Sequence, residues 1–347
     1  MSEVSPISSR KSDHIRINLE EDVSSGLTTG FEKLHFVHQA LPELDLDEID
    51  PAVEIFGKRL KIPLLISSMT GGTSEAGVIN RKLAAAAQFT GTAMGVGSQR
   101  AGLAHTELID TFKIRSVAPN ILLFANIGAV QLNYGYSIDE CRQAVEMIEA
   151  DGLILHLNAL QEALQPEGNT RFADLLKKIE TICRLLPVPV VVKEVGWGIS
   201  GKCAKQLESA GVSAIDVAGA GGTSWSQVEM FRTKDKHRKN VVSAFRAWGI
   251  PTVDSIRQVL KAVPDMLVFA SGGMKDGIDV AKSIALGASL GGMASLFLKA
   301  AVVSEKETID TINEIGDELK VCMFACGVQD IQALKLTQLV RLNEIEE

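Results

Sequence analysis

Short apolar runs alternate with amphipathic stretches along most of this chain. Each amphipathic stretch ends near a glycine, an apolar run follows, and a polar or glycine-rich corner closes the unit, as in AKQLESAGVSAIDVAG at 204–219 and VAKSIALGASLGGMAS at 280–295. A glycine at a helix C-terminus adopts the left-handed conformation that lets the chain turn into a strand. Nearly continuous apolar runs are typical of strands buried on both faces. The pattern therefore predicts repeated helix–strand units with parallel strands.

Eight such runs occur, and stretches with helical periodicity separate them. The predicted strands span 62–68, 92–97, 121–127, 152–158, 188–194, 213–218, 266–271 and 289–295. The predicted helices include 75–89, 138–150, 170–186, 200–210 and 276–286. Eight alternating β and α units favour a closed α/β barrel, the (β/α)8 TIM barrel, over an open sheet. A doubly wound sheet of eight strands is the structural alternative.

Three segments fall outside the repeat. Residues 1–61 form an N-terminal extension, an arm that we expect to contribute to the active site, and residues 62–347 form the barrel domain. Residues 219–250 make an unusually long connection after the sixth strand, and a loop of that length in a compact domain is usually functional or disordered. We predict an active-site flap there. Residues 302–342 predict two extra C-terminal helices, broken near Gly327.

Composition and charge narrow the function classes. Hydrophobic residues make up 46% and charged residues 22% of the 347 residues, an ordinary globular balance. With a net charge of −8, the chain lacks the positive electrostatic field that nucleic-acid-binding proteins have, so nucleic acid is not an expected partner. No apolar run reaches the length of a membrane span and Met1–Lys11 holds no signal-like core, so we expect a cytoplasmic protein without a membrane partner. The five scattered cysteines predict free thiols and no metal site.

In a barrel of this type the corners that follow the strands form the active face, and here every corner is polar or glycine-rich. Gly272-Gly273 follows the seventh predicted strand, and Gly291–Ser295 closes the eighth. Barrels commonly bind a phosphate at these two corners through backbone N–H groups and a helix N-terminus. Glycine lets the main chain approach the anion closely. The sequence therefore predicts a phosphate site there.

The fourth and fifth corners carry candidate chemistry. Lys193 closes a valine-rich strand and should point into the barrel mouth, where a buried ammonium needs an anionic partner. It could form a Schiff base, face the electron-rich edge of a cofactor, or reach out to bulk water. His156 and Asn158 alternate on one strand and so face the same side, with Gln161 and Glu162 just beyond. Glu162 is the candidate Mg²⁺ ligand.

Near the N-terminus, the run Arg10-Lys11-Ser12-Asp13-His14 gathers three basic groups within five residues. Such a run is either a solvated tail or a folded-over arm that supplies ligands to a diphosphate. The strand ends offer no pair of catalytic carboxylates, no nucleophile elbow and no Ser-His-Asp set. Acid–base chemistry at this site would therefore fall to a cofactor.

Seven phrases from Arg10 to about Phe297 carry a resemblance to a known family. They are RKSDHI at 10–15, SSMTGG at 67–72, VGSQR at 96–100, HLNALQEALQPEGN at 156–169, VVKEVGWG at 191–198, GAGGTSW at 219–225 and FASGGM at 269–274. With these phrases the chain resembles the type 2 isopentenyl-diphosphate isomerases. The resemblance implies a barrel that interconverts isopentenyl and dimethylallyl diphosphate for isoprenoid biosynthesis, using reduced FMN, Mg²⁺ and NAD(P)H as reductant. It also implies a homotetramer or homooctamer.

Position by position, the resemblance implies the following roles. FMN would contact Ser68, Met69, Thr70, Ser98, Asn126, Lys193, Thr223, Gly272, Gly273, Ala294 and Ser295. The substrate would contact Arg10, Lys11, His14, Ser98, Gln99, Arg100, His156, Asn158 and Gln161. Gln161, Lys193 and His156 would serve catalysis, and Glu162 would bind Mg²⁺ that bridges to the diphosphate. Ala159 departs from the proline of many members, and Ser295-Leu296 departs from the residues often seen after the last strand.

Two rival functions stay open on the sequence alone. The first is another FMN-dependent barrel oxidoreductase, such as a 2-hydroxy-acid oxidase, which would need a histidine in the loop after Lys193 and an arginine for the carboxylate. The sequence VKEVGWGIS offers neither. The second is a non-catalytic barrel that binds a phosphorylated metabolite. Gln161, Glu162 and Lys193 argue against it, because such groups are unfavourable in a barrel mouth that does no chemistry.

Overall fold

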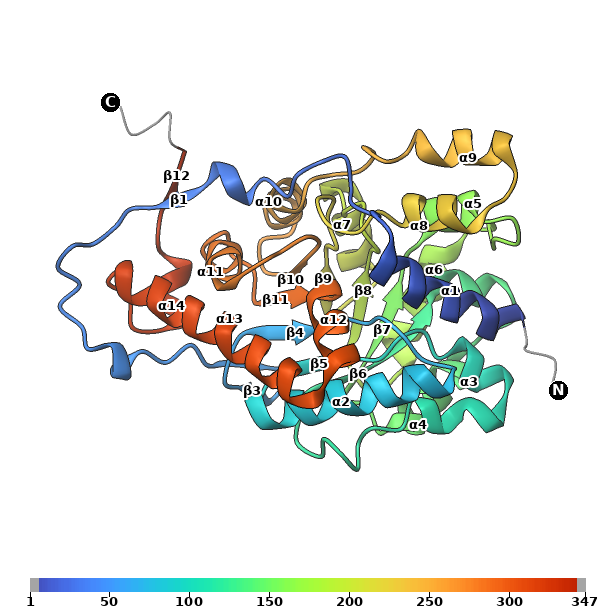
Figure 1. Cartoon of the computed structure of the whole chain (residues 1–347), viewed down its shortest axis with the longest axis horizontal. Coiled ribbons are helices and arrows are strands. Elements are labelled where there is room, and N and C mark those ends of the chain that lie inside the picture. The colour runs from blue at the N-terminus through green and yellow to red at the C-terminus, as the bar shows by residue number, and fades with distance from the viewer. Residues whose placement is uncertain (1–5, 342–347) are drawn as a thin grey trace.

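Eight parallel strands close into a barrel in the computed structural model, which describes residues 6–341, with side chains from Lys11 onward (Figure 1). The strands are β4 (Leu64–Ile66), β5 (Ala93–Gly95), β6 (Leu123–Gly128), β7 (Gly152–His156), β8 (Val190–Lys193), β9 (Ala214–Asp216), β10 (Leu267–Ser271) and β11 (Leu290–Met293). Each strand pairs with the next, and β11 pairs with β4 to complete the ring. All eight predicted strands and the TIM barrel are confirmed, and the doubly wound sheet is wrong.

The strands form because their residues are buried on both faces. Inward-facing side chains such as Leu65, Phe124 and Phe269 make one cluster inside the ring. Their neighbours in sequence, for example Leu64 and Ala125, belong to the larger cluster that the surrounding helices cover. Complete burial of a side chain of this size contributes about 1.5–3 kcal/mol, so two apolar faces stabilise even strands of three residues.

One end of the barrel is plugged by the N-terminal extension. Its hairpin, β2 (Val53–Ile55) and β3 (Lys58–Leu60), places Ile55 and Leu60 in the interior cluster. The ring of Phe56 meets Phe124 and Phe269 edge-on, with centroid distances of 6.3 and 6.4 Å. Within the described residues, the end of the barrel left open to a ligand is the opposite one, where the strands finish.

Helices surround the barrel and extend it at the C-terminus. They are α2 (Ser74–Thr90), α3 (Arg100–Ala104), α4 (Ile138–Ile148), α6 (Leu175–Leu185), α7 (Gly201–Ser209), α10 (Thr252–Ala262), α11 (Gly277–Ala285), α12 (Ser295–Val303), α13 (Glu305–Ala325) and α14 (Ile331–Lys335). Gly327, in the left-handed conformation (φ 69°), separates the last two, as predicted. No helix within residues 6–341 is long and apolar enough to cross a membrane.

The helix predicted over 170–186 begins five residues late, at Leu175. Asn133 accounts for the difference, because its side-chain amide donates to the carbonyls of Arg171 and Ala173 at 2.8 and 3.0 Å. Asp174 then takes a left-handed conformation (φ 58°) immediately before the helix. A contact across the fold therefore overrides the local helical periodicity.

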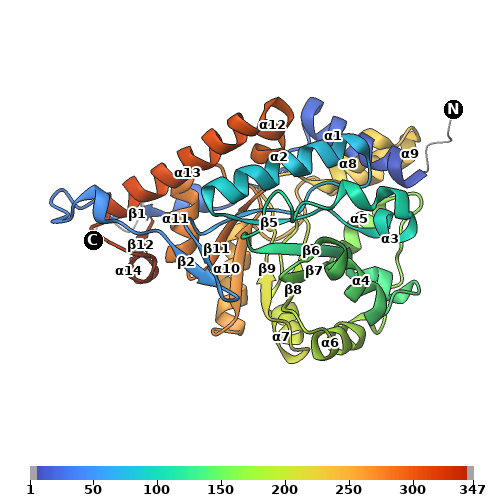
Figure 2. The ribbon, with the colours of Figure 1, turned by 90° about the horizontal axis from the view of Figure 1, so that it is seen from below.

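The predicted flap at 219–250 contains two short helices, α8 (Trp225–Arg232) and α9 (Lys236–Ser243). The N-terminal helix α1 (Pro6–Glu20) packs on α8, which also contacts α5 (Ala159–Leu164). Figure 2 shows α1, α8 and α9 gathered at one end of the molecule. At the other end, the two-residue strands β1 (His35–Phe36) and β12 (Leu339–Val340) join the N- and C-terminal segments.

Candidate active site

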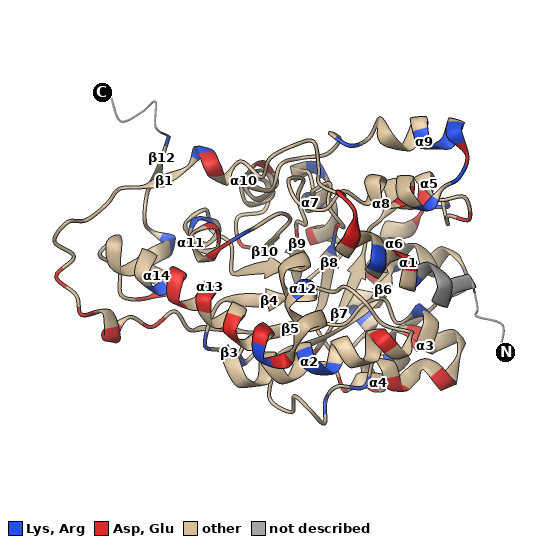
Figure 3. Cartoon of the chain, in the orientation of Figure 1, with Lys and Arg blue, Asp and Glu red and all other residues tan. Residues whose placement is uncertain are grey.

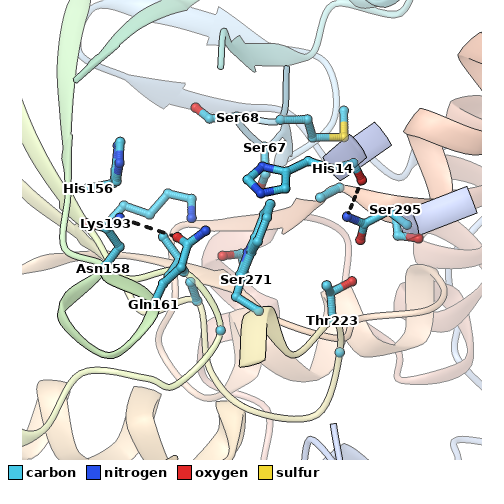
Figure 4. A pocket seen from close by; sticks show the side chains of 18 of the residues that line it. His14, Ser67, Ser68, His156, Asn158, Gln161, Lys193, Thr223, Ser271 and Ser295 are labelled. Carbon is cyan, nitrogen blue, oxygen red and sulfur yellow. Dashed lines mark hydrogen bonds between the residues drawn. The ribbon is translucent and has the colours of Figure 1, made fainter. Parts of the chain in front are cut away.

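A cavity of about 310 Å³ lies at the end of the barrel where the strands finish. All eight strand corners contribute residues to it, and helix α1 and the flap close over it. The cavity brings Lys193, Glu162 and the Gly272–Gly273 bend to one place, although Glu162 and Gly273 are 111 positions apart in the sequence. Figure 4 shows side chains from several of these corners converging on the same space.

Most of the residues predicted for the site line this cavity. They are Lys11, His14, Ser68, Met69, Thr70, Ser98, Arg100, Asn126, His156, Asn158, Gln161, Glu162, Lys193, Thr223, Gly272, Gly273, Ala294 and Ser295. Arg10 lies in α1, but its side chain is outside the described part of the structure.

Gln99, predicted as a substrate contact, is placed behind the cavity wall. Its side chain is fully buried, donates to the carbonyl of Ala144 at 2.8 Å and accepts from the N–H of Asn126 at 2.9 Å. The backbone turns at this corner, so that Ser98 and Arg100 face the cavity while the amide of Gln99 ties β6 to α4. The structure therefore gives the Gln99 side chain a supporting position.

The corners after β9 and β10 pack against each other main chain to main chain. Gly272 and Gly273 have positive φ values of 110° and 74°, which only glycine adopts readily. A Cβ at Gly222 would lie 2.6 Å from the nitrogen of Gly273, and one at Gly273 would lie 2.5 Å from the carbonyl oxygen of Gly221. No side chain fits between these corners, so their backbone polar groups line the cavity directly.

Helix α12 starts next to these glycines, at Ser295. Its N-cap residue, Ala294, supplies no side-chain hydrogen bond to the first turn. Free N–H groups at a helix N-terminus, with the dipole behind them, attract an anion. The glycine corners and the start of α12 together form a cradle of the kind that was predicted to hold a phosphate.

The opposite wall is made of side chains, beginning with His156. Asn126 donates through Nδ2 to the carbonyl of Val96 at 3.0 Å, which turns its Oδ1 toward Nδ1 of His156 at 2.8 Å. Because that oxygen accepts only, Nδ1 of His156 is the donor in this hydrogen bond. This hydrogen bond fixes the tautomer of the ring with a proton on Nδ1, and Nε2 is the ring nitrogen that does not contact Asn126.

Glu162 is held by two donors at the β7 corner. Asn158 donates to its Oε1 at 2.9 Å and the backbone N–H of Asn169 to its Oε2 at 2.5 Å. Arg100 and Gln131 both donate to the side-chain oxygen of Asn169, at 3.3 and 3.0 Å. The described residues contain no group of three acidic, histidine or cysteine side chains that could hold a metal. Mg²⁺ at Glu162 would thus need phosphate oxygens from a ligand, a coordination that Mg²⁺ commonly adopts.

Glu229 of α8 is a site residue that the sequence did not point to. Its carboxylate is 2% exposed, accepts from Nε2 of Gln161 at 3.3 Å and meets His14 and Arg232 at 3.3 and 2.6 Å. Burial raises the pKa of Glu229, but the hydrogen bonds and charges of His14 and Arg232 outweigh it and hold that pKa below its ordinary value. This carboxylate joins the flap to α1 and α5 over the cavity.

Helix α1 also reaches the cavity through Lys11. Its ammonium donates to the carbonyl of Ser98 at 2.7 Å and lies 5.1 Å from the centre of the Phe112 ring. Three other charged or basic side chains, Arg100, His156 and Lys193, line the same cavity. Elsewhere on the molecule α9 is basic and α13 is largely acidic (Figure 3). In an otherwise acidic protein, several cations therefore gather in one cavity.

On the floor of the cavity, Lys193 is 8% exposed and donates to the carbonyl of Glu194 at 2.5 Å. One carboxylate oxygen of Glu194 accepts from the N–H groups of Val195, Gly196 and Trp197 at 2.6, 2.7 and 2.5 Å. Burial raises the pKa of Glu194 to about 7 against the pull of these donors. Val195 and Gly196 line the cavity, so the hydrogen bonds that their N–H groups donate to this carboxylate hold that part of the cavity wall in shape.

Several buried polar atoms around the cavity have no partner in the described part of the chain. They include the hydroxyl oxygens of Ser67 and Ser68 and the side-chain oxygen of Asn158. Such atoms normally have partners when a site is filled, because an unpaired buried polar group costs about 1–3 kcal/mol. Together with the phosphate cradle and Lys193, they fit a polar cofactor that carries a phosphate.

This chain is similar to known proteins both in sequence and in structure. A family model described as FMN-dependent dehydrogenase matches residues 149–341. An isopentenyl-diphosphate delta-isomerase of Synechocystis sp. is 53% identical over 334 residues, which cover 96% of this chain and 94% of the relative. The proteins of that name from Nostoc sp. and Rickettsia bellii are 52% and 51% identical, and each comparison covers at least 94% of both chains.

Solved structures of a mandelate oxidase share the fold at low sequence identity. The one with benzoyl-formic acid aligns with a TM-score of 0.68 at 17% identity and covers 96% of this chain and 94% of that chain. The one with (S)-2-phenylpropionate gives a TM-score of 0.65 at 16% identity and covers 96% of each. At this level of identity the likeness extends to the barrel architecture alone.

Proposed function

Because this chain belongs to the isopentenyl-diphosphate delta-isomerase family, within the wider family of FMN-dependent dehydrogenases, we propose that it interconverts isopentenyl and dimethylallyl diphosphate with reduced FMN and Mg²⁺. The observation that carries the proposal is the pairing of two anion sites in one cavity. A main-chain cradle lies on one side, and cationic and acidic side chains lie on the other. A phosphate-bearing cofactor and a diphosphate substrate need both.

The cradle would hold the phosphate of FMN. Thr223, Gly272, Gly273, Ala294 and Ser295 surround that position. Along the rest of the cofactor we place Ser68, Met69, Thr70, Ser98, Asn126 and Lys193. When bound, the reduced flavin would supply the group that gives a proton to one carbon of the alkene and accepts one from another.

The side-chain wall would bind the substrate. Lys11, His14, Arg100 and His156 line the cavity where a diphosphate would meet cations and N–H donors. Arg10, one residue before Lys11 on the same helix, would add to this set. Glu162 would hold Mg²⁺ against the diphosphate oxygens, as its carboxylate is already oriented by Asn158 and Asn169.

Gln161 points into the cavity near Asn158 and Lys193 (Figure 4), and we place it beside the isoprenoid carbons. Its amide is held by hydrogen bonds with Glu229 on the flap and with Asn158 on its own corner. The closure of α1 and α8 over these groups would keep water from the reacting carbons. We further propose NAD(P)H as the reductant and a homotetramer or homooctamer as the assembly. Exposed apolar side chains on several helices, including Phe89 and Trp248, are consistent with such contacts.

The decisive experiment is an anaerobic assay of the purified full chain with FMN, a reductant, Mg²⁺ and isopentenyl diphosphate. The expected result is formation of dimethylallyl diphosphate that stops when Mg²⁺ is chelated or the flavin is kept oxidised. The rival oxidoreductase would instead reduce its flavin with a 2-hydroxy acid. A protein that bound FMN but formed no allylic isomer under these conditions would refute the proposed reaction.

A further inference from the structure

Three neighbouring strands place a row of ionisable side chains under the cavity. In the register of the barrel, His156 of β7 lies opposite Lys193 of β8, and Lys193 lies opposite Asp216 of β9. Side chains of residues paired in this way point to the same side of a parallel sheet. His156 and Lys193 line the cavity (Figure 4), so Asp216 points into the barrel just beneath it.

Asp216 is a completely buried carboxylate with one oxygen satisfied and one not. Its exposed fraction is 0%. Oδ1 accepts from the hydroxyl of Ser271 at 2.5 Å and from the N–H of Ala218 at 3.2 Å, whereas Oδ2 has no partner among the described residues. Two donors on one oxygen favour the ionised form. An ionised, buried oxygen without a donor is unfavourable, so a charged donor within reach would stabilise it.

Lys193 is the charged donor that the row provides. Only one of its three N–H groups has a partner in the structure, the neutral carbonyl of Glu194, and no carboxylate within residues 6–341 forms an ion pair with it. Burial raises the pKa of Asp216 above its ordinary value, and the positive charge of Lys193, together with the hydrogen bonds from Ser271 and Ala218, only partly opposes this rise. The carboxylate of Glu194 is engaged by three backbone N–H groups of its own loop.

We propose that Asp216 is a positioning residue that acts through Lys193. Its negative charge attracts the ammonium and directs it across the cavity floor, where a flavin would present its electron-rich edge. The identity of the flavin rests on the function proposed above, whereas the neighbouring positions of the two residues in the barrel do not. If Asp216 only tied β9 to β10 through Ser271, its charge would make no difference to Lys193.

The Asp216→Asn variant separates these two roles. Asparagine keeps the size of the side chain and an oxygen that accepts from Ser271 and Ala218, but it has no charge. In the full chain with flavin removed, labelling of Lys193 by a small amine-reactive reagent at pH 8, followed by peptide mass spectrometry, reports how reactive that lysine is. We expect labelling of Lys193 to rise roughly tenfold, and the dissociation constant of FMN to rise by a similar factor, after loss of a neighbouring opposite charge.

Asp279→Asn is the matched control. Asp279 is also a buried carboxylate, 9% exposed, but it lies in α11 outside the cavity. Its substitution should change neither the labelling of Lys193 nor the affinity for FMN. A folded Asp216→Asn protein that labels and binds FMN like the wild type would overturn the proposal.

A second measurement decides the matter if Asp216→Asn does not fold. The Lys193→Met variant removes the positive charge next to Asp216. A buried carboxyl group whose pKa is raised in the folded state lowers native stability once the pH exceeds the pKa of that group in the unfolded chain. The drop in melting temperature should therefore be larger at pH 8 than at pH 5, and an equal drop at both would reject the pairing. Labelling and melting need no turnover, so failure of the isomerase assay leaves these results interpretable.

Discussion

The two sides of the cavity offer different kinds of groups to a ligand. The glycine side comprises the corners after β9, β10 and β11 with the start of α12, and it presents main-chain groups whose geometry depends on positive φ angles. The side-chain side comprises the corners after β5, β6, β7 and β8 with α1 and α8. It presents charged groups that hydrogen bonds hold in place, as Asn158 holds Glu162.

This difference predicts two kinds of sensitivity. The glycine side tolerates no added Cβ, because its two corners are in main-chain contact, but it carries few groups that titrate. The side-chain side can absorb small changes of shape, but each of its charges depends on partners from other segments. Glu229, for example, depends on His14 and Arg232. Substitutions that change volume should therefore damage the first side, and substitutions that change charge should damage the second.

The largest effect is expected for Gly272→Ala. A Cβ at this position would collide with the backbone of Gly219, and φ of 110° is strained for alanine. We expect FMN affinity, measured by fluorescence titration, to fall at least hundredfold, about 2.7 kcal/mol. Gly135→Ala is the control, since Gly135 has φ of 98° but nothing within 4 Å of an added Cβ. Equal loss of FMN in both variants would mean that backbone strain, not the cradle, is responsible.

Glu162→Gln should produce the next largest effect, on the side-chain side. The amide keeps the shape of the corner but removes the negative charge proposed to hold Mg²⁺. We expect isomerase activity to fall roughly hundredfold, with a higher Mg²⁺ concentration for half-maximal rate, as is common when metal coordination is weakened. Glu167→Gln, just beyond the end of α5 and with a side chain 54% exposed, should behave nearly as wild type. Full activity of Glu162→Gln with an unchanged Mg²⁺ requirement would refute the metal assignment.

Lys11→Ala should have a smaller effect, confined to substrate binding. The ammonium lies at the cavity wall next to Ser98, where the diphosphate is proposed to bind. Removal of a contact made equally in the bound and transition states raises KM and leaves kcat nearly unchanged, and we expect KM to rise roughly tenfold. Arg16→Ala removes a charge from the same helix at a position 52% exposed, and KM should not change. A fall in kcat alone would contradict this role for the arm.

The fold was largely accessible from the sequence because its strands are buried on both faces. That burial gives eight nearly continuous apolar runs, and the glycines before and after them are visible as letters. The plug at the other end was not predicted. Ile55, Phe56 and Leu60 form an ordinary short apolar group, and only the three-dimensional closure of the barrel gives them a space to fill.

The sequence predicted those site residues whose side-chain direction follows from their position at the end of a strand. Lys193 and Gly272 were found because strand ends meet at one face of a barrel. Glu229 could not be found, because a glutamate in a short helix is usually on the surface, and here its burial depends on α1. Asp216 did leave a signal, an acidic residue between Ile215 and Val217 in a buried strand. The side-chain direction of Gln99 depends on how the backbone turns at its corner, which the sequence does not specify.

The smallest effect on the site, and a test of the pH sensitivity of the side-chain side, is expected from Glu194→Gln. Burial raises the pKa of Glu194 to about 7, above its ordinary value of 4.5, so ionisation weakens the native state increasingly as the pH rises from about 4.5 to 7. Glutamine still accepts from the three backbone N–H groups but stays neutral. Its melting temperature relative to wild type should therefore rise by a few degrees between pH 5 and pH 8. Ser295→Ala, on the glycine side, adds and removes no titratable group, and its difference from wild type should not depend on pH. If Glu194→Gln instead lost stability relative to wild type over this range, the three N–H donors would outweigh burial, and the carboxylate would stabilise this corner as an anion.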